Sequence, residues 1–345
     1  MVVLITGATG LVGSAVAKEF LSLGFTVKAL IRSESSKVAL KSVSDKIEIV
    51  EGDVLDVISL GEALKGVDYV VHAAAVVSFS PKERANMYKV NIEGTANVVN
   101  ACLASNIKKL CFISSVAALG RPAQTLIHSG EKITIDEKQK WESSDTNSHY
   151  AITKYLAECE VWRGQAEGLH TVIVNPSIIL GEGDWSKSST QLFRYVFNEK
   201  PFYTQGFINY VDVLDLSTII KALMLSEIEN ERFCVSSGLI SYKEFFEKIA
   251  ANFEKKSPSF EVKPWMMDYL WRFEALKSWI TGKAPLITKE TAKTSRLQVF
   301  YSSSKLKKAI GFEFRPLDTT LKRVCGNLVS KSEFLQKIKL SIRII

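Results

Sequence analysis

Tyr150 and Lys154 stand four residues apart in a segment of mixed apolar and polar residues. If Tyr150 opens a helix, this spacing places its phenol and the Lys154 ammonium one turn apart on the same face. Asn147 or Ser148 could then cap the amino-terminal end of that helix. The ordinary pKa of tyrosine is about 10, and a nearby positive charge lowers it by stabilising the phenolate. The pair therefore indicates proton transfer near neutral pH, with an ordinary surface helix as the alternative when the spacing is taken alone.

Two serines, Ser114 and Ser115, come at the end of an apolar run that predicts a strand over Leu110–Ser114. A hydroxyl at a strand end could hydrogen-bond the oxygen of a bound substrate. The alternative is a serine that satisfies local backbone groups, which is common at such positions.

Three glycines, Gly7, Gly10 and Gly13, follow the apolar run Val2–Ile5 and precede the amphipathic segment Ser14–Leu21. This order predicts a buried strand, a tight turn and a helix. Glycines permit the turn and let the backbone approach a ligand closely. The amino-terminal end of the helix carries unpaired N–H groups and partial positive charge. The segment therefore predicts a site for a pyrophosphate, and an ordinary glycine-rich turn is the alternative.

The elements that would position these residues alternate along the first half of the chain. Most of the predicted strands are short apolar runs, as expected when both faces of a sheet are covered. Helical segments such as Val90–Ser105 lie between them, which indicates a parallel sheet built from right-handed crossovers. We therefore predict an α/β fold with a Rossmann-type, doubly wound parallel sheet. The predicted strands are Val2–Thr6, Thr26–Ile31, Ile47–Glu51, Tyr69–His72, Leu110–Ser114 and Thr171–Asn175.

The alternation fades after Pro176. We expect residues 1–175 to form the nucleotide-binding Rossmann domain. Residues 176–345 would form a smaller, mostly helical substrate lobe that is interleaved with the sheet. Short strand-like pieces lie near Phe207–Val211 and Arg232–Ser236, and some segments of this lobe would return to the sheet.

Composition bounds the function. The 345 residues are 46% hydrophobic and 23% charged, which is typical of a globular protein with a large core. The formal charge of +7 is spread along the chain without a nucleic-acid motif, so we assign it mainly to solubility. The five cysteines lack paired spacing, which favours reduced thiols and a cytoplasmic location. We expect no secretory signal, no membrane-spanning segment and no metal site.

The glycine motif, the serine and the Tyr-Lys pair together resemble the short-chain dehydrogenase/reductase superfamily. The chain length and motif layout resemble its extended branch, the NAD-dependent epimerase/dehydratase family. The resemblance covers most of the chain. Where the family usually has Arg-Pro, this chain has Asn175-Pro176, which puts one local contact in doubt. Further matches are Asp53-Val54, His72 through Ala75, Asn91, Tyr210–Asp215 and the stretch from Ser303 to Pro316.

The resemblance implies a role for each matched residue. Tyr150 would be the general acid/base, Lys154 would hold the nicotinamide ribose and tune Tyr150, and Ser115 would orient the substrate oxygen. Ser115 is preferred to Ser114 because Gly120 follows it by the family spacing of five residues. The implied cofactor contacts are Gly7, Thr9, Gly10, Leu11, Val12, Gly13, Arg32, Asp53, Val54, Ala73, Ala74, Ala75, Asn91, Ser114, Tyr150, Lys154, Asn175, Pro176, Ser177 and Ile178.

Arg32 ends the second predicted strand, with Lys37 and Lys41 nearby. An acidic residue at this place binds the ribose 2′-hydroxyl of NAD, whereas an arginine accommodates a 2′-phosphate. A guanidinium suits phosphate and cannot accept a hydrogen bond from a hydroxyl. We therefore predict NADP(H) rather than NAD(H). A solvated basic strand end is the alternative.

The residues after Ser115 narrow the reaction. Sugar dehydratases of the extended branch carry Asp-Glu there, whereas this chain has Val116-Ala117, which cannot transfer protons. Epimerases of this branch often have Tyr-Gly where this chain has Leu119-Gly120, and this difference mildly disfavours a nucleotide-sugar epimerase. The chain resembles the dihydroflavonol-reductase-like and 3β-hydroxysteroid-dehydrogenase-like groups, although Gly120 stands where the plant flavonoid enzymes have their substrate asparagine.

We therefore expect an NADP(H)-dependent oxidoreductase that reduces a ketone or aldehyde, or oxidises the matching secondary alcohol. One alternative is a nucleotide-sugar epimerase that holds its cofactor tightly. Another is a non-catalytic NADP-binding sensor or scaffold. The expected partner is a small carbonyl or alcohol substrate of apolar character. The family also makes a homodimer a candidate assembly.

Two segments are left without a role. Residues 264–283 place Met266, Tyr269, Leu270 and Phe273 at helical spacing beside three tryptophans. A packing helix is the first interpretation, and an apolar lid or a membrane-contacting patch is the alternative. The tail Lys337–Arg343 alternates basic and apolar residues, which could form an edge strand, a weak surface anchor or a frayed terminus.

Overall fold

The computed structural model describes residues 1–120, 133–144, 147–184, 189–263 and 299–342, together with Met266 and Tyr269, and the side chains through residue 329. Most of the tryptophan-rich segment 264–283 therefore lies outside the described residues, and its predicted role is not tested.

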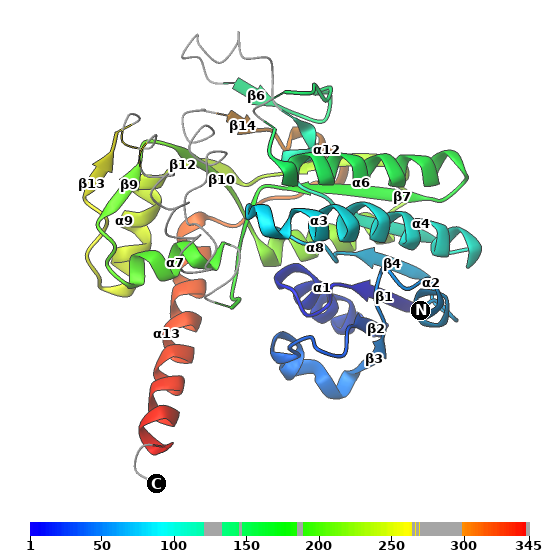
Figure 1. Cartoon of the computed structure of the whole chain (residues 1–345), viewed down its shortest axis with the longest axis horizontal. Coiled ribbons are helices and arrows are strands. Elements are labelled where there is room, and N and C mark those ends of the chain that lie inside the picture. Colours follow the sequence, from blue (N-terminus) through cyan, green and yellow to red (C-terminus); the bar gives the residue numbers. More distant parts are fainter. Residues whose placement is uncertain are drawn as a thin grey trace.

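A seven-stranded sheet forms the centre of the molecule (Figure 1). Its strand order is β11-β7-β5-β4-β1-β2-β3, and every neighbouring pair is parallel. The order reverses between β1 and β4, and such a switch point opens a crevice at the carboxyl ends of the strands. The strands are β1 (Val2–Thr6), β2 (Thr26–Ile31), β3 (Ile47–Glu51), β4 (Tyr69–His72), β5 (Lys109–Ile113), β7 (Thr171–Pro176) and β11 (Glu231–Val235).

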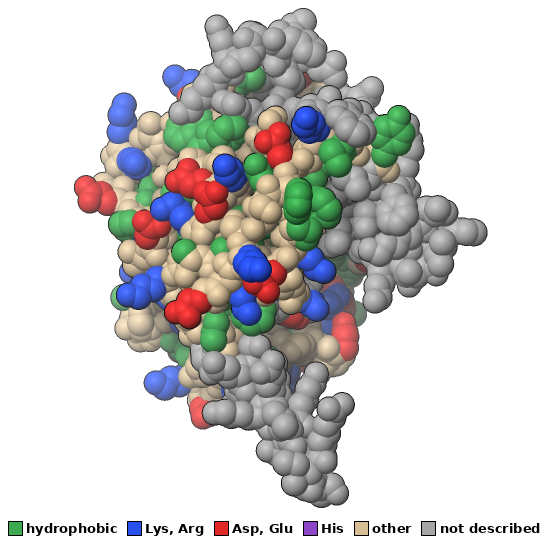
Figure 2. Space-filling model, turned by 90° about the vertical axis from the view of Figure 1, so that its left-hand side faces the viewer, with side chains coloured by type: hydrophobic (Ala, Val, Ile, Leu, Met, Phe, Trp, Pro, Cys, Tyr) green, Lys and Arg blue, Asp and Glu red, His purple; other side chains and the backbone are tan. Residues whose placement is uncertain are grey.

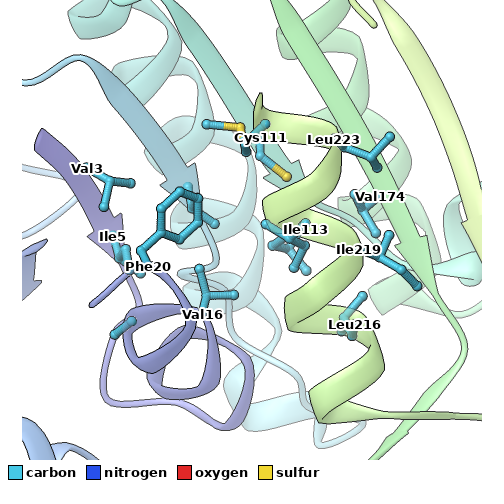
Figure 3. Packing of buried hydrophobic residues seen from close by; sticks show 14 of the residues in the cluster. Val3, Ile5, Val16, Phe20, Cys111, Ile113, Val174, Leu216, Ile219 and Leu223 are labelled. Atoms are coloured by element: carbon cyan, nitrogen blue, oxygen red, sulfur yellow. The ribbon is translucent and has the colours of Figure 1, made fainter. Parts of the chain in front are cut away.

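Helices cover both faces of this sheet. On one face, α1 (Leu11–Ser22) and α8 (Val213–Leu225) pack against the strands through one buried cluster. Figure 3 shows Val16 and Phe20 of α1 and Leu216 of α8 directed toward the strands. On the other face, α2 (Val57–Ala63), α4 (Gly94–Ala104) and α6 (His149–Ala166) bury a second cluster. The doubly wound parallel sheet is thus confirmed.

The smaller C-terminal region has its own buried cluster, which joins helices and short strands. Strand β11 leaves this region and joins the main sheet beside β7. The remaining strands of the described part are β6 (Ile133–Ile135), β8 (Ile178–Leu180), β9 (Phe202–Thr204), β10 (Phe207–Asp212), β12 (Gly238–Ser241), β13 (Phe260–Val262) and β14 (Val299–Tyr301). The remaining helices are α3 (Arg84–Tyr88), α7 (Thr190–Phe197), α9 (Tyr242–Phe253), α12 (Ser304–Ile310) and α13 (Leu317–Ile342).

The tail corrects one expectation. Helix α13 continues through Ile342, so an edge strand over Lys337–Arg343 is wrong (Figure 1). The first half of α13 buries Leu321, Val324 and Leu328, and this spacing fixes one face of the helix against the C-terminal region. Once a helix is nucleated, each further residue adds a hydrogen bond. The helix therefore continues into a segment whose own alternation is ambiguous.

The mixed surface charges and the free cysteines agree with the expectations drawn from the composition. In Figure 2, basic and acidic side chains are interspersed on the face shown, without a large patch of one sign. Cys102, Cys111, Cys234 and Cys325 are buried, and Cys159 is partly buried; all five are free thiols. Among the described residues, no helix is long and apolar enough to cross a membrane.

Candidate active site

The turn after β1 is closed too tightly for side chains. Gly7 has a φ of +68°, and a Cβ at this residue would lie 2.6 Å from Ala74 N. A Cβ on Gly13 would lie 2.3 Å from Gly7 O, although the φ of Gly13 is ordinary. Gly10 N donates to Gly7 O at 2.9 Å. The absence of side chains at these glycines thus lets the turn close and pack against the loop after β4.

Helix α1 begins directly from this turn. Its N-cap is Gly10, which has no side chain to bond the first N–H groups of Leu11 and Val12. Those groups and the helix dipole favour an anion at this end. The glycine turn and the uncapped amino-terminal end of α1 fit the pyrophosphate of a dinucleotide.

Arg32 comes directly after β2, and its side chain is 54% exposed. Its Nε lies 3.2 Å from Glu34 Oε1, an ion pair that the sequence analysis did not consider. Asp53 follows β3, and its Oδ1 accepts from Leu55 N at 2.9 Å. Both residues lie at the carboxyl edge of the sheet, where the adenosine half of a dinucleotide would be expected.

The loop after β4 lies against the glycine turn. Ala74 N donates to Thr6 Oγ1 at 3.2 Å, and this hydroxyl also bonds His72 Nδ1 at 2.7 Å. Burial, and then the charge of Lys154, lowers the pKa of His72 to about 3, so this histidine is neutral. The segment Ala73–Ala75 is thereby held beside Gly7.

Asn91 lies in a π-helical turn, η3 (Lys89–Glu93), ahead of α4. Its amide bonds both backbone groups of Val76, at 2.8 and 3.0 Å, and donates to Thr153 Oγ1 at 3.0 Å. Thr153 in turn donates to Tyr150 O at 2.8 Å. The predicted helical segment Val90–Ser105 is therefore helical, with a π-helical first turn ahead of α4. The wider turn directs Asn91 inward, where it joins the β4 loop to the helix that carries Tyr150.

Helix α6 begins as expected, because Ser148 is its N-cap and accepts from Ala151 N at 3.1 Å. Ser115 lies beside the Tyr150 phenol and acts to lower its pKa, and the Ser115 hydroxyl accepts from Ala117 N at 3.2 Å. Lys154 is buried one turn later, and its Nζ donates to Ile113 O at 2.8 Å. The three predicted catalytic residues therefore meet at the carboxyl end of β5.

The sequence predicts that a nearby positive charge lowers the pKa of Tyr150, but in the structure this pKa is raised. Burial raises the pKa of Tyr150, and Ser115 acts against that rise. Burial lowers the pKa of Lys154 to about 7, and the charge of Glu158 acts against that fall. The protein's own groups thus leave the phenol harder to ionise than a free tyrosine, which suits a proton donor.

Ser114 and Asn175, two of the predicted cofactor contacts, both bond Glu158. The Ser114 hydroxyl and the Asn175 amide each lie 2.5 Å from Glu158 Oε1 and donate to it. The donors of both side chains thus bond a buried carboxylate, whereas Asn175 Oδ1 is buried without a hydrogen-bond partner among the described residues. Glu158 was missed, although its position four residues after Lys154 places it on the same helix face.

The last predicted contacts follow β7. Pro176 ends that strand, and Ser177 N donates to Val235 O at 2.9 Å. The Ser177 hydroxyl is buried without a hydrogen-bond partner among the described residues. Ile178 begins β8 and is 37% exposed.

An exposed apolar ring lies beside Tyr150. The Phe79 ring lies 6.4 Å from the Tyr150 ring, edge to face, and is 44% exposed. Val77, on the same loop, is 55% exposed. Exposed apolar side chains beside a reactive group favour an apolar ligand.

Comparison with known proteins adds to this geometry. The model of the NAD dependent epimerase/dehydratase family matches residues 3–202. A Synechocystis protein with the provisional name dihydroflavonol 4-reductase is 26% identical over 314 residues, which cover 89% of this chain and 88% of that protein. Cinnamoyl-CoA reductase 1 of Petunia hybrida is 28% identical over 63% of this chain and 66% of its own. The crystal structure of gox2253 superposes with a TM-score of 0.80, at 29% identity, over 96% of this chain and 98% of that one.

Proposed function

Because the chain belongs to the NAD dependent epimerase/dehydratase family, we propose that it is an NADP(H)-dependent carbonyl reductase. It reduces an apolar ketone or aldehyde to the alcohol, or runs the same reaction in reverse. The observation that carries the proposal is the position of Ser115 beside the Tyr150 phenol, one turn from Lys154. The reductase names of two relatives support it.

Each residue has a defined task in this mechanism. A bound NADPH supplies a hydride for the carbonyl carbon. Ser115 orients the carbonyl oxygen by hydrogen bonding, and Tyr150 donates a proton to that oxygen as negative charge develops. Lys154 stabilises the phenolate that remains, since an adjacent ammonium favours the charged form of the phenol. Phe79 and Val77 form an apolar wall that excludes water from the carbonyl.

NADP(H) is the proposed cofactor because Arg32 follows β2 and remains half-exposed. Its guanidinium can bond a 2′-phosphate through two N–H groups. Glu34 competes for the same guanidinium, so the preference for NADP(H) depends on whether the phosphate displaces this ion pair. The sequence gives no acidic residue directly at the end of β2, where a 2′-hydroxyl would need one.

The test is NADPH oxidation with a panel of aromatic and aliphatic ketones and aldehydes, repeated with NADH. The proposal predicts turnover with at least one apolar carbonyl and a higher kcat/KM with NADPH. A protein that purifies with bound nicotinamide and shows no net redox would instead be an epimerase. Failure to bind any nicotinamide dinucleotide would reject both.

A further inference from the structure

Glu158 is a fully buried carboxylate on α6, one turn after Lys154. Its Oε1 accepts from Ser114 Oγ and Asn175 Nδ2, each at 2.5 Å. Its Oε2 accepts from Arg232 Nη1 at 3.2 Å. Removing a carboxylate from water costs several kcal/mol unless donors replace the lost hydration. Here three side chains from β7, β11 and the end of β5 supply those donors.

These contacts are those of an ionised carboxylate. Both oxygens receive hydrogen bonds, and an ionised carboxylate is an acceptor only. Burial raises the pKa of Glu158, whereas Ser114, Arg232 and Asn175 act in the opposite direction. Arg232 is itself held in place, because its Nη2 donates to Glu137 O at 2.5 Å and its guanidinium lies 5.5 Å from the centre of the Trp162 ring.

The proposed catalytic residues share this network. Lys154 Nζ donates to Ile113 O at 2.8 Å. Ser114, the next residue, bonds Glu158 through its hydroxyl, and Asn175 Nδ2 donates at 2.8 Å to the carbonyl of Ser115, the residue after that. Three successive residues at the end of β5 are thus each fixed by Lys154, Glu158 or a side chain bonded to Glu158.

We propose that Glu158 is a positioning residue of this site, with two effects. Its hydrogen bonds fix the end of β5 that carries Ser115, and its negative charge keeps the Lys154 ammonium protonated in the protein interior. The proposal rests on the proposed function for the identity of the site, while the network itself consists of contacts within the chain.

The charges around Lys154 make the second effect measurable. Burial lowers the pKa of Lys154 to about 7, and Glu158 opposes this. Tyr150 lies on the same helix, and the His72 of β4, with a pKa of about 3, is neutral at pH 7. Arg232, from β11, faces Glu158. Removal of the Glu158 charge should therefore lower the pKa of Lys154 and leave this side chain largely neutral at pH 7.

The direct test is an NMR titration of protein labelled with ε-13C-lysine, with the Lys154 signal assigned by Lys154→Arg. Glu158→Gln keeps the size of the side chain and removes its charge. It should lower the pKa of Lys154 by roughly one unit, at the lower end of the effect of a close opposite charge. Glu158→Asp retains the charge, so the pKa of Lys154 should stay close to its wild-type value. Glu160→Gln is the control, because Glu160 is on the same helix but is partly exposed and paired with Arg163. This variant should leave the pKa of Lys154 unchanged.

An activity measurement adds a second readout. Reduction requires the protonated ammonium, so the high-pH limit of kcat/KM should move to lower pH in Glu158→Gln and stay in place in Glu158→Asp. The kcat of Glu158→Asp should fall because the shorter side chain no longer holds Ser114 and Asn175. An unchanged Lys154 pKa in folded Glu158→Gln overturns the proposal.

The test also holds if Glu158→Gln does not fold or if the wild type shows no reductase activity. If Glu158→Gln does not fold, Arg232→Gln replaces it, because loss of the guanidinium favours protonation of Glu158 and should also lower the pKa of Lys154. No change in that pKa would overturn the proposal in this variant too. If the wild type reduces no carbonyl, the proposed function fails, while the NMR titration still decides the role of Glu158.

Discussion

Gly7 and Ala74 are in direct backbone contact, since a Cβ on Gly7 would stand 2.6 Å from Ala74 N. The turn after β1 and the loop after β4 therefore form one surface, at the switch point of the sheet. This contact leaves no room for any side chain between the two loops. It also means that the predicted pyrophosphate turn and the Ala73–Ala75 segment cannot shift independently.

Gly7→Ala and Gly13→Ala should both abolish nucleotide binding. Gly7→Ala combines the clash with a φ of +68°, whereas Gly13→Ala introduces only the clash with Gly7 O. Each should also destabilise the fold by about 1–3 kcal/mol, as overpacking does. Gly24→Ala is the matched control, because Gly24 has a φ of +77° with nothing near its Cβ position.

Urea unfolding and NADPH binding by fluorescence separate these variants. Gly24→Ala should lose about 1 kcal/mol of stability from its left-handed backbone and bind NADPH like the wild type. NADPH binding by Gly13→Ala at wild-type affinity would show that the turn does not contact the nucleotide.

Tyr150→Phe should lower kcat by about 100-fold or more, the usual contribution of a general acid. The ring remains, so its contact with Phe79 and the affinity for NADPH should be preserved. Steady-state kinetics with the best carbonyl substrate, together with an NADPH titration, measures both effects. A variant that retains wild-type kcat would remove Tyr150 from the role of proton donor.

Much of this site could be predicted from the sequence because its signals are local. The glycine turn, the Ser148 cap and the Tyr150-Lys154 spacing each lie within a few residues. Strands β1 to β4 begin and end where their apolar runs do. Strand β5 is shifted by one residue at both ends from its predicted bounds, and β7 is one residue longer at its carboxyl end.

The residues that the sequence did not reveal depend on distant partners. A lysine followed four residues later by a glutamate usually indicates an exposed ion pair. Glu158 is instead buried, because Arg232, 74 residues away, and Asn175 supply its donors. The π-helical turn at Asn91 was equally hidden, because its cause is the contact with Val76 and Thr153 rather than local propensity.

Arg32→Ser should weaken NADPH binding by roughly 10- to 100-fold, the equivalent of losing hydrogen bonds to a charged group. NADH binding should change little, because NADH lacks the 2′-phosphate. Glu34→Gln should have the opposite effect and strengthen NADPH binding about two- to fivefold, since it releases Arg32 from an exposed ion pair. Titration of each variant with NADPH and with NADH measures these affinities. An unchanged ratio of the NADPH and NADH affinities in Arg32→Ser would contradict the assignment of Arg32 to the 2′-phosphate.

His72 should make the fold sensitive to acid. Its pKa is about 3 in the folded chain, below its ordinary value of 6.5, so the unfolded chain binds the extra proton between these pH values. Stability should therefore be complete above pH 6.5 and fall by about 1.4 kcal/mol per pH unit below it from this residue alone.

Urea unfolding of the wild type and His72→Asn at pH 7, 6, 5 and 4 measures this effect. The variant starts less stable, because it loses hydrogen bonds to Thr6 and Thr95, but its stability should fall less steeply with pH. Equal slopes for the wild type and His72→Asn would show that His72 is not buried in its neutral form.

Phe79→Ala should discriminate between substrates. The ring stands edge to face with Tyr150 and is half-exposed, so an apolar substrate would bury what remains of its surface. Loss of about 1 kcal/mol of apolar contact predicts a roughly fivefold rise in KM for an aromatic carbonyl. Small aliphatic carbonyls, which do not reach the loop, should show little change. Ile58→Ala, which removes an apolar side chain that is 80% exposed on α2, is the control. Equal effects of Phe79→Ala on aromatic and small substrates would mean that the ring supports Tyr150 and does not contact the substrate.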